Sequence, residues 1–354
     1  MEREIPLIIP AYEPDNRMIF LIKDLRTQYK GSIIVVNDGS SSDYDHLYEE
    51  ASGYGCDIIK HYRNLGKGRA LKDAFNYCLN RFPDMIGCVT ADSDGQHHPD
   101  DIFRCMDSLR NNPDKLILGC RNFEGDNIPA KSRFGNKLTM KVCKLLCGLE
   151  ISDTQTGLRG IPKSFMADML GVQGERFEYE TRMLIESKNR YPIYEMEIET
   201  IYDSKENHQT HLEPIKDSVR IYKIFGGVFL NFLFSSLSSG ILDVLLFYLF
   251  AKVLKQSTVY YLLIATIFAR IISASYNYAV NYTFVFQSDE KHGKSVSKYI
   301  ALAVVQMCCS GFFVTLGCRV FWILPEVAIK IVVDTLLFFL SYMVQREIIF
   351  KRNK

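Results

Sequence analysis

The chain has 354 residues, enough for two ordinary domains, and its net charge of +1 favours neither a nucleic-acid binder nor a strongly charged partner. That average hides a division: residues 1–223 carry a net charge of −5, and residues 224–354 carry +6. The ten cysteines form no Cys-x-x-Cys pair, which indicates reduced thiols. The first residues lack a basic and a long apolar region, so we expect no secretory signal.

The first part alternates short apolar runs with polar segments of helical character. Strands are predicted at residues 6–9, 32–36, 57–60, 86–90 and 116–119. Helices are predicted between them, at residues 17–29, 68–80 and 100–111. This alternation predicts a mostly parallel sheet covered on both faces, with ligands bound at the carboxyl ends of the strands.

Two loops after predicted strands carry side chains suited to a nucleotide. Asp38, followed by Gly39, can bind a ribose or base edge, although Asp-Gly-Ser is also an ordinary turn. Lys67 lies in a glycine-containing loop without P-loop spacing, which excludes an ATPase of that class. Lys67 could approach a diphosphate or be an ordinary solvated lysine.

The loop after the fourth predicted strand reads Asp-Ser-Asp-Gly-Gln-His-His. Buried without partners, Asp92 and Asp94 would be costly, but beside a diphosphate they can bind Mg²⁺ or Mn²⁺. Gln96 offers a further oxygen ligand. A solvated acidic turn is the alternative. His97 and His98 could also bind a metal, but capping or packing is the more usual role.

Residues 130–149 place apolar side chains on one helical face beside five Lys and Arg residues. Such a helix suits the surface of an anionic membrane, and an ordinary helix packed on the sheet is the alternative. A second basic segment, residues 214–224, precedes the apolar part of the chain. Together the two segments could bracket a lipid phosphate.

The second part contains four long apolar runs, at about residues 225–250, 259–280, 299–321 and 327–349. Each is long enough to cross a bilayer, whereas a soluble helical bundle is the less favoured alternative. Lysines lie in the loop between the second and third runs and in the tail of the chain. By the positive-inside rule we expect this loop and the tail on the cytoplasmic side, together with the N-terminal domain. Asp243 and Asp334 lie inside these runs and are expected to face a partner or a cavity.

Taken in order, the loops resemble the motifs of family 2 glycosyltransferases, with dolichol-phosphate mannose synthases and bactoprenol glucosyltransferases as the most similar branch. The resemblance rests on residues 9–12, 37–41, 64–68 and 92–97, with further matches at 119–121, 153–159 and 214–222. It implies an α/β GT-A fold for residues 1–223, a nucleotide-sugar donor, Mg²⁺ or Mn²⁺, and inversion at the anomeric carbon.

The resemblance also implies roles for single residues. Pro10, Tyr12, Asp38, Lys67 and Asp92 would bind the nucleotide-sugar. Asp92, Asp94 and Gln96 would hold the metal, and the catalytic residues would be Asp92, Asp94 and Asp153. Arg121, Arg133 and Arg159 would contact the acceptor phosphate.

The chain departs from the family pattern at two places. Glu13-Pro14 replaces the usual Asn-Glu after the tyrosine, which puts the fine nucleotide contacts in doubt. Thr210-His211-Leu212 replaces Ser-His-Phe, which puts the acceptor-side packing in doubt.

Residues 224–354 resemble the GtrA family of four-span membrane proteins, through segments 277–286 and 341–350. That family is associated with moving lipid-linked sugars across the bilayer. A simple membrane anchor is the alternative, and the two remain open.

These observations predict a membrane-bound hexosyltransferase that makes a polyprenyl-phosphate sugar, with UDP-glucose as favoured donor and undecaprenyl phosphate as acceptor. Other donors (GDP-mannose, UDP-GlcNAc), a non-lipid acceptor and a non-enzymatic lipid-sugar transporter are the alternatives. A lipid phosphate is already ionised near neutral pH, so it needs no strong base. A processive polysaccharide synthase is disfavoured, because such enzymes carry a Gln-x-x-Arg-Trp motif. The only tryptophan here, Trp322, ends an apolar run and is not part of such a motif. The sequence leaves the oligomeric state open, a homo-oligomer included.

Overall fold

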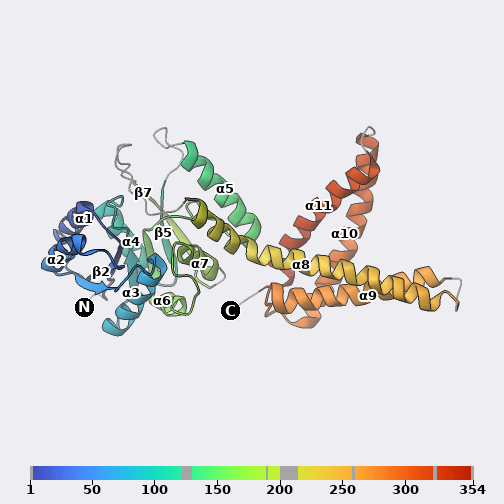
Figure 1. Ribbon diagram of the computed structural model, residues 1–354, viewed down its shortest axis with the longest axis horizontal. Helices are drawn as coiled ribbons and strands as arrows, with labels where there is room; N and C mark the ends of the chain where they lie inside the picture. Colours follow the sequence, from blue (N-terminus) through green and yellow to red (C-terminus); the bar gives the residue numbers. More distant parts are fainter. Residues whose placement is uncertain are drawn as a thin grey trace. The chain divides into compact units, whose positions relative to one another are not determined.

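The structure is a computed structural model, and it describes the backbone of residues 3–121, 130–188, 190–199, 214–256, 260–321 and 325–351. Side chains are described over the same ranges, except at residues 130–138, 214–225 and 327. The chain divides into two compact units, a first unit of residues 1–224 and a second unit of residues 225–354 (Figure 1).

The first unit is built on a seven-stranded sheet in the order β3-β2-β1-β4-β6-β5-β7. The strands are β1 (Leu7–Ala11), β2 (Ile33–Asn37), β3 (Asp57–Lys60), β4 (Gly87–Thr90), β5 (Leu116–Arg121), β6 (Arg159–Pro162) and β7 (Ile193–Ile198). Strands β1 to β4 pair in parallel, β5 pairs in parallel with β7, and β6 is antiparallel to both of its neighbours.

All five predicted strands are present in the structure. The two that sequence patterning did not predict are β6 and β7. Strand β6 has four residues, including an arginine, a glycine and a proline, and β7 lies at a sheet edge with two glutamates. Neither has the continuous apolar run that marks a strand buried on both faces.

Helices cover both faces of the sheet, as the alternation predicts (Figure 1). On one face, α1, α2 and α4 pack on a core that includes Leu7, Ile9 and Val35. On the other face, α3 contacts β1 and β2, and α6 contacts β4 and β6. The helices of this unit are α1 (Asn16–Arg26), α2 (Asp45–Gly53), α3 (Lys67–Arg81), α4 (Pro99–Asn111), α5 (Ala130–Cys147), α6 (Lys163–Met169) and α7 (Glu178–Ser187), with a short helix at Ser42–Tyr44.

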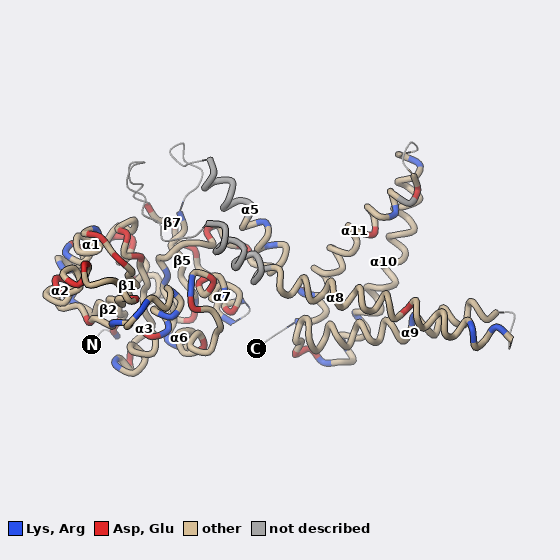
Figure 2. The backbone as a smooth tube through the Cα atoms, in the orientation of Figure 1, with Lys and Arg blue, Asp and Glu red and all other residues tan. Residues whose placement is uncertain are grey.

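The second unit consists of long helices with few charged residues (Figure 2). They are α8 (Pro214–Leu254), which begins in the first unit, α9 (Tyr261–Val280), α10 (His292–Val320) and α11 (Glu326–Val344). Within the described residues, four segments are long and apolar enough to cross a membrane: Gly226–Leu254, Tyr261–Val285, His292–Val320 and Ala328–Ile349. These segments overlap all four predicted spans.

Helices α9 and α11 both end in a π-helical turn, at Asn281–Val285 and Gln345–Ile349. The first residues of these two turns are buried and hydrogen-bonded, with Asn281 Nδ2 donating to Gln345 Oε1 at 3.0 Å. Asn277 Oδ1 accepts from Asn281 Nδ2 at 3.1 Å and from Tyr299 Oη at 2.8 Å. Beside this network the rings of Phe286 and Phe350 stack, 5.4 Å apart. Polar and aromatic contacts thus join the ends of α9 and α11 to each other, and Tyr299 joins α10 to α9.

Asp243 and Asp334, the carboxylates expected inside the predicted spans to face a partner or a cavity, both have polar partners. Asp243 accepts from Ser273 Oγ at 2.8 Å and lies 3.3 Å from Arg270 Nη2. Asp334 accepts from Ser310 Oγ at 2.7 Å and from Lys330 Nζ at 2.8 Å. Each carboxylate therefore joins a serine of the neighbouring helix to a basic side chain.

The network predicts a coupling between Asn281 and Gln345. Gln345→Leu should destabilise the second unit by about 1 kcal/mol, because it leaves the Asn281 amide buried without that partner. The double variant Asn281→Leu/Gln345→Leu should lose less stability than the sum of the two single losses. Thermal melting in detergent measures this, with Ser275→Ala as control because its exposed hydroxyl bonds only to its own helix. Additive losses would contradict the coupling.

The loop after β1 contains a strained residue. Glu13 has φ 48°, the left-handed conformation, and its N–H donates to Ser40 Oγ at 2.8 Å. This is the position where the family pattern has asparagine, which tolerates this conformation better than glutamate. The departure noted in the sequence therefore carries a backbone cost.

Glu13→Asn should accordingly stabilise the first unit by about 0.5–1 kcal/mol, because Asn relieves the left-handed strain. A rise in Tm during thermal melting would register this gain. The same substitution at Glu49, an exposed residue in the helix α2, should be neutral or destabilising. An equal shift at both positions would show that the backbone conformation of Glu13 is not the cause.

Candidate functional site

The loop after β4 places Asp92 beside Lys67, whose side chain is 16% exposed. Lys67 Nζ donates to Asp92 Oδ1 at 2.6 Å and lies 2.9 Å from Glu180 Oε2. Lys67 begins helix α3, and Glu180 belongs to α7, so three distant segments meet here. The Asp92 side chain keeps 29% of its surface exposed and can still contact a ligand.

The electrostatics of this group follow from the pairing. Burial raises the pKa of the Asp92 carboxyl, but the charge of Lys67 and contacts with His97 outweigh it and hold that pKa well below its usual range. Burial lowers the pKa of Lys67, but Asp92 and Glu180 together raise it. For Asp94, burial and then the charge of Asp92 raise the pKa. Asp92 is therefore ionised and a weak base, whereas Asp94 carries a carboxylate that a cation would stabilise.

Gly157 leaves room for the Asp92 carboxylate. A Cβ added at Gly157 would lie 2.1 Å from Asp92 Oδ2, so no other residue fits without displacing that carboxylate. The carbonyl of Gly157 accepts from Thr90 Oγ1 at 2.9 Å, which fixes this loop to the end of β4. The position of Asp92 thus depends on the loop of residues 153–157.

The loop of residues 153–157 also contains Asp153, which contacts Arg121, one of the residues predicted to bind the acceptor phosphate. Arg121 and Asp153 form a two-pronged ion pair, Nε to Oδ2 at 2.7 Å and Nη2 to Oδ1 at 3.1 Å. Asp153 is completely buried and also accepts from the N–H of Gln155 at 3.0 Å, whereas Arg121 is a quarter exposed. Asp153 is therefore engaged in fixing Arg121 and the loop. Its predicted catalytic role stays a prediction.

Asp38 is almost fully buried at 3% exposure. One oxygen accepts from the N–H of Leu65 at 2.9 Å and lies 2.7 Å from His61 Nδ1, and the other accepts from the N–H of Gly66 at 2.8 Å. His61 Nε2 lies 3.1 Å from Asp73. Asp38 thus holds the loop that delivers Lys67. Its predicted contact with the nucleotide stays untested.

The other predicted nucleotide residues lie at the end of β1. Pro10 is a buried residue of that strand, opposite Val36 in the register. Tyr12 follows the strand and is partly exposed, and burial followed by the charge of Glu13 raises its pKa. Of these two, Tyr12 is the one placed to reach a ligand.

The predicted metal ligands share one loop. Asp94 Oδ1 accepts from the N–H of Gln96 at 3.0 Å, and the Asp92, Asp94 and Gln96 side chains are partly exposed. Two carboxylates and an amide oxygen are hard donors that fit Mg²⁺ or Mn²⁺. In the described part of the chain, no group of three or more His, Cys, Asp or Glu side chains is placed to hold a metal ion. His98 caps α4, as its sequence position suggested.

Arg159 has a different environment from the one expected of an acceptor contact. It is 1% exposed, and it donates to the carbonyls of Thr156 and Glu180 at 2.9 and 2.8 Å. This interior position does not favour contact with a lipid phosphate. Arg133 lies in α5, but its side chain is outside the described residues, as are the side chains of residues 214–225.

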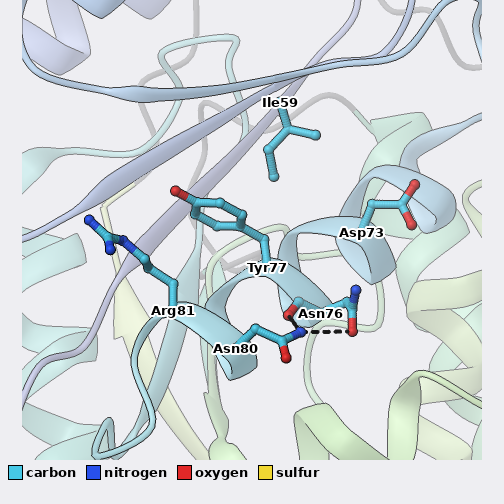
Figure 3. A pocket seen from close by; sticks show the side chains of 6 residues that line it. All are labelled: Ile59, Asp73, Asn76, Tyr77, Asn80 and Arg81. Carbon is cyan, nitrogen blue, oxygen red and sulfur yellow. Dashed lines mark hydrogen bonds between the residues drawn. The ribbon is translucent and has the colours of Figure 1, made fainter.

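A separate groove of about 560 Å³ runs between β3 and α3 (Figure 3). Its lining side chains are Ile59, Asp73, Asn76, Tyr77, Asn80 and Arg81. None of them is a predicted site residue, and only Asp73 contacts the site, through His61. We therefore place the functional site at the carboxyl ends of the strands and not in this groove.

Comparison with known families agrees with the two-unit structure. The chain matches the glycosyl transferase family 2 over residues 7–170 and the GtrA/DPMS transmembrane domain over residues 231–350. Glucosyl-3-phosphoglycerate synthase from Mycobacterium tuberculosis, solved with Mn²⁺, UDP and glucosyl-3-phosphoglycerate, has a TM-score of 0.45 and 14% identity. That alignment covers 62% of this chain and 76% of the synthase.

Two of the relatives are named for transfer to a dolichyl phosphate or for synthesis of a polyprenol monophosphate sugar. The UDP-N-acetylglucosamine–dolichyl-phosphate N-acetylglucosaminyltransferase of Methanococcus voltae is 31% identical over 221 residues, 57% of this chain and 87% of that protein. The polyprenol monophosphomannose synthase of Mycolicibacterium smegmatis is 26% identical over 160 residues, 43% of this chain and 59% of the synthase. The chain belongs to glycosyltransferase family 2, as a membrane protein in which an α/β GT-A domain precedes a GtrA/DPMS transmembrane domain.

Proposed function

We propose that this glycosyltransferase moves one sugar from a nucleotide-sugar to a polyprenyl phosphate, at the cytoplasmic face of the membrane. The observation that carries the proposal is the loop of residues 153–157. At one end Asp153 fixes Arg121, which is suited to a phosphate, and at the other end Gly157 seats Asp92. One loop therefore joins the predicted acceptor side to the predicted donor side.

The chemistry requires little proton transfer. A lipid phosphate has a second pKa of about 6, so it is already a nucleophile near neutral pH. Asp92 is paired with Lys67 and Asp153 with Arg121, so neither is a free strong base. We infer that the chain acts mainly by positioning the two phosphates and by balancing the charge of the leaving diphosphate.

We propose that Asp92, Asp94 and Gln96 hold a Mg²⁺ or Mn²⁺ ion beside the donor diphosphate. Such a cation supplies Lewis-acid stabilisation of the leaving group. The support is the donor set itself, two carboxylates and an amide oxygen on one partly exposed loop. Lys67, whose Nζ donates to Asp92 Oδ1 at 2.6 Å, contributes a further positive charge.

The donor sugar is proposed from the sequence and the relatives. The motifs favour UDP-glucose, whereas the relative from Methanococcus voltae is named for UDP-N-acetylglucosamine and the one from Mycolicibacterium smegmatis for mannose transfer. The same active-site arrangement would serve any of the three. An assay of this chain should therefore compare UDP-glucose, UDP-GlcNAc and GDP-mannose.

We propose that the second unit anchors the enzyme beside its lipid acceptor. Movement of the product across the bilayer, the role implied by the GtrA resemblance, stays a prediction. In support of lipid contact, side chains of α8, α10 and α11 line a mostly apolar groove of about 1,030 Å³. Its charged lining residues are Glu326, Lys330 and Asp334.

Asp94→Ala should reduce sugar transfer about 100-fold or more, because a ligand of the diphosphate-bound cation is lost. The measurement is transfer of radiolabel from each of the three donors to undecaprenyl phosphate in detergent with Mg²⁺ or Mn²⁺. Asp107→Ala is the matched control, since its carboxylate is exposed on α4 and pairs only with Arg110. If the wild type labels no lipid with any donor while it binds nucleotide, the lipid acceptor is wrong.

Gly157→Ala should leave the fold intact but lower kcat/KM about 100-fold, because the new methyl group displaces the Asp92 carboxylate. Gly171→Ala is the control, since the nearest atom to its added Cβ is 3.8 Å away. The same transfer assay, together with Tm, measures both variants. Full activity of Gly157→Ala would mean that the position of Asp92 does not matter for the reaction.

A further inference from the structure

Glu180 lies at the centre of the site, although no sequence motif marks it. It is 8% exposed, and its Oε2 lies 2.9 Å from Lys67 Nζ. Its other oxygen is 4.0 Å from Arg159 Nε, and its carbonyl accepts from Arg159 Nη1 at 2.8 Å. Arg159, Glu180, Lys67 and Asp92 therefore form a row of alternating charges that leads from the interior to the exposed loop.

The lysine loop is packed tightly against the segment that carries Glu180. A Cβ added at Gly66 would lie 2.4 Å from the carbonyl oxygen of Glu175, and one at Gly68 would lie 2.6 Å from Tyr179 Cβ. The N–H of Arg69 donates to the Glu175 carbonyl at 3.0 Å. These contacts keep the start of α3 against α7, so Lys67 stays within reach of Glu180.

The charges explain why two carboxylates are useful. With both Asp92 and Glu180 present, the charge of Lys67 is more than balanced. When a donor diphosphate and its cation engage Asp92, that carboxylate no longer neutralises Lys67. Glu180, which Arg159 holds in place, still pairs with Lys67. Lys67 is then oriented toward the phosphates without losing its last negatively charged partner.

We propose that Glu180 is a positioning residue that retains Lys67 for the donor diphosphate, with Arg159 as the anchor of Glu180. This inference rests on the proposed function of the site. It gives the buried Arg159 a role in the interior in place of acceptor contact. It predicts that Glu180 affects diphosphate binding only through Lys67.

A double-mutant cycle tests this dependence on the full chain in detergent. Binding of UDP and of GDP, each with Mg²⁺, is measured by calorimetry for the wild type, Lys67→Met, Glu180→Gln and the double variant. The matching monophosphates are measured in parallel, and Glu186→Gln on the same helix serves as control. Thermal melting reports whether each variant is folded.

Glu180→Gln should weaken diphosphate binding about 10-fold and monophosphate binding much less, because a charge-assisted contact to the outer phosphate is lost. In the Lys67→Met background the same substitution should have no further effect. Unchanged diphosphate affinity in Glu180→Gln, or a loss that adds to that of Lys67→Met, would overturn the inference. Where Glu180→Gln does not fold, the cycle is run with Glu180→Asp, which keeps the charge and should bind diphosphate with intermediate affinity.

The wild type separates this inference from the proposed function. If it binds neither nucleoside diphosphate, the proposed function fails. If it binds one of them and transfers sugar, but Glu180→Gln binds equally well, only the role of Glu180 fails.

Discussion

The candidate site depends on one largely enclosed lysine, Lys67. A lysine ammonium removed from water is stable only with charged or hydrogen-bonding partners, and Lys67 has Asp92 and Glu180 at 2.6 and 2.9 Å. To meet these partners, the start of α3, the loop after β4 and helix α7 must come together. The arrangement of three segments around one cation therefore explains much of the geometry of the site.

Close backbone approaches make this arrangement possible. Gly66 and Gly68 let the lysine loop pack on the segment before α7, Gly39 lets the loop after β2 approach Arg63, and Gly157 makes room for Asp92. The loop that contains Gly157 also contains Asp153, which fixes Arg121. Charge pairing and glycine packing thus connect the predicted donor and acceptor sides within a few residues.

The sequence predicted the fold class, five of the seven strands and the four apolar membrane segments, because apolar runs and their alternation with helical segments mark all of them. It did not predict β6 or β7, whose polar residues hide the strand pattern. The motifs brought Lys67 and Asp92 to the same site, but not Glu180, which lies in an ordinary helical sequence and is recognised only by its contact with Lys67. The interior position of Arg159 was also not predicted, since arginine side chains are usually exposed and β6, which begins at Arg159, was itself not predicted.

In the proposed reaction, the sugar leaves a nucleoside diphosphate and becomes attached to a lipid phosphate. The most direct measurement is the balance between the two products, with nucleoside diphosphate quantified in the aqueous phase and the lipid phase analysed by mass spectrometry. We expect one nucleoside diphosphate to be released for each polyprenyl phosphate that gains a single sugar residue. Release of diphosphate without a sugar-bearing lipid, or a lipid carrying several sugars, would contradict it.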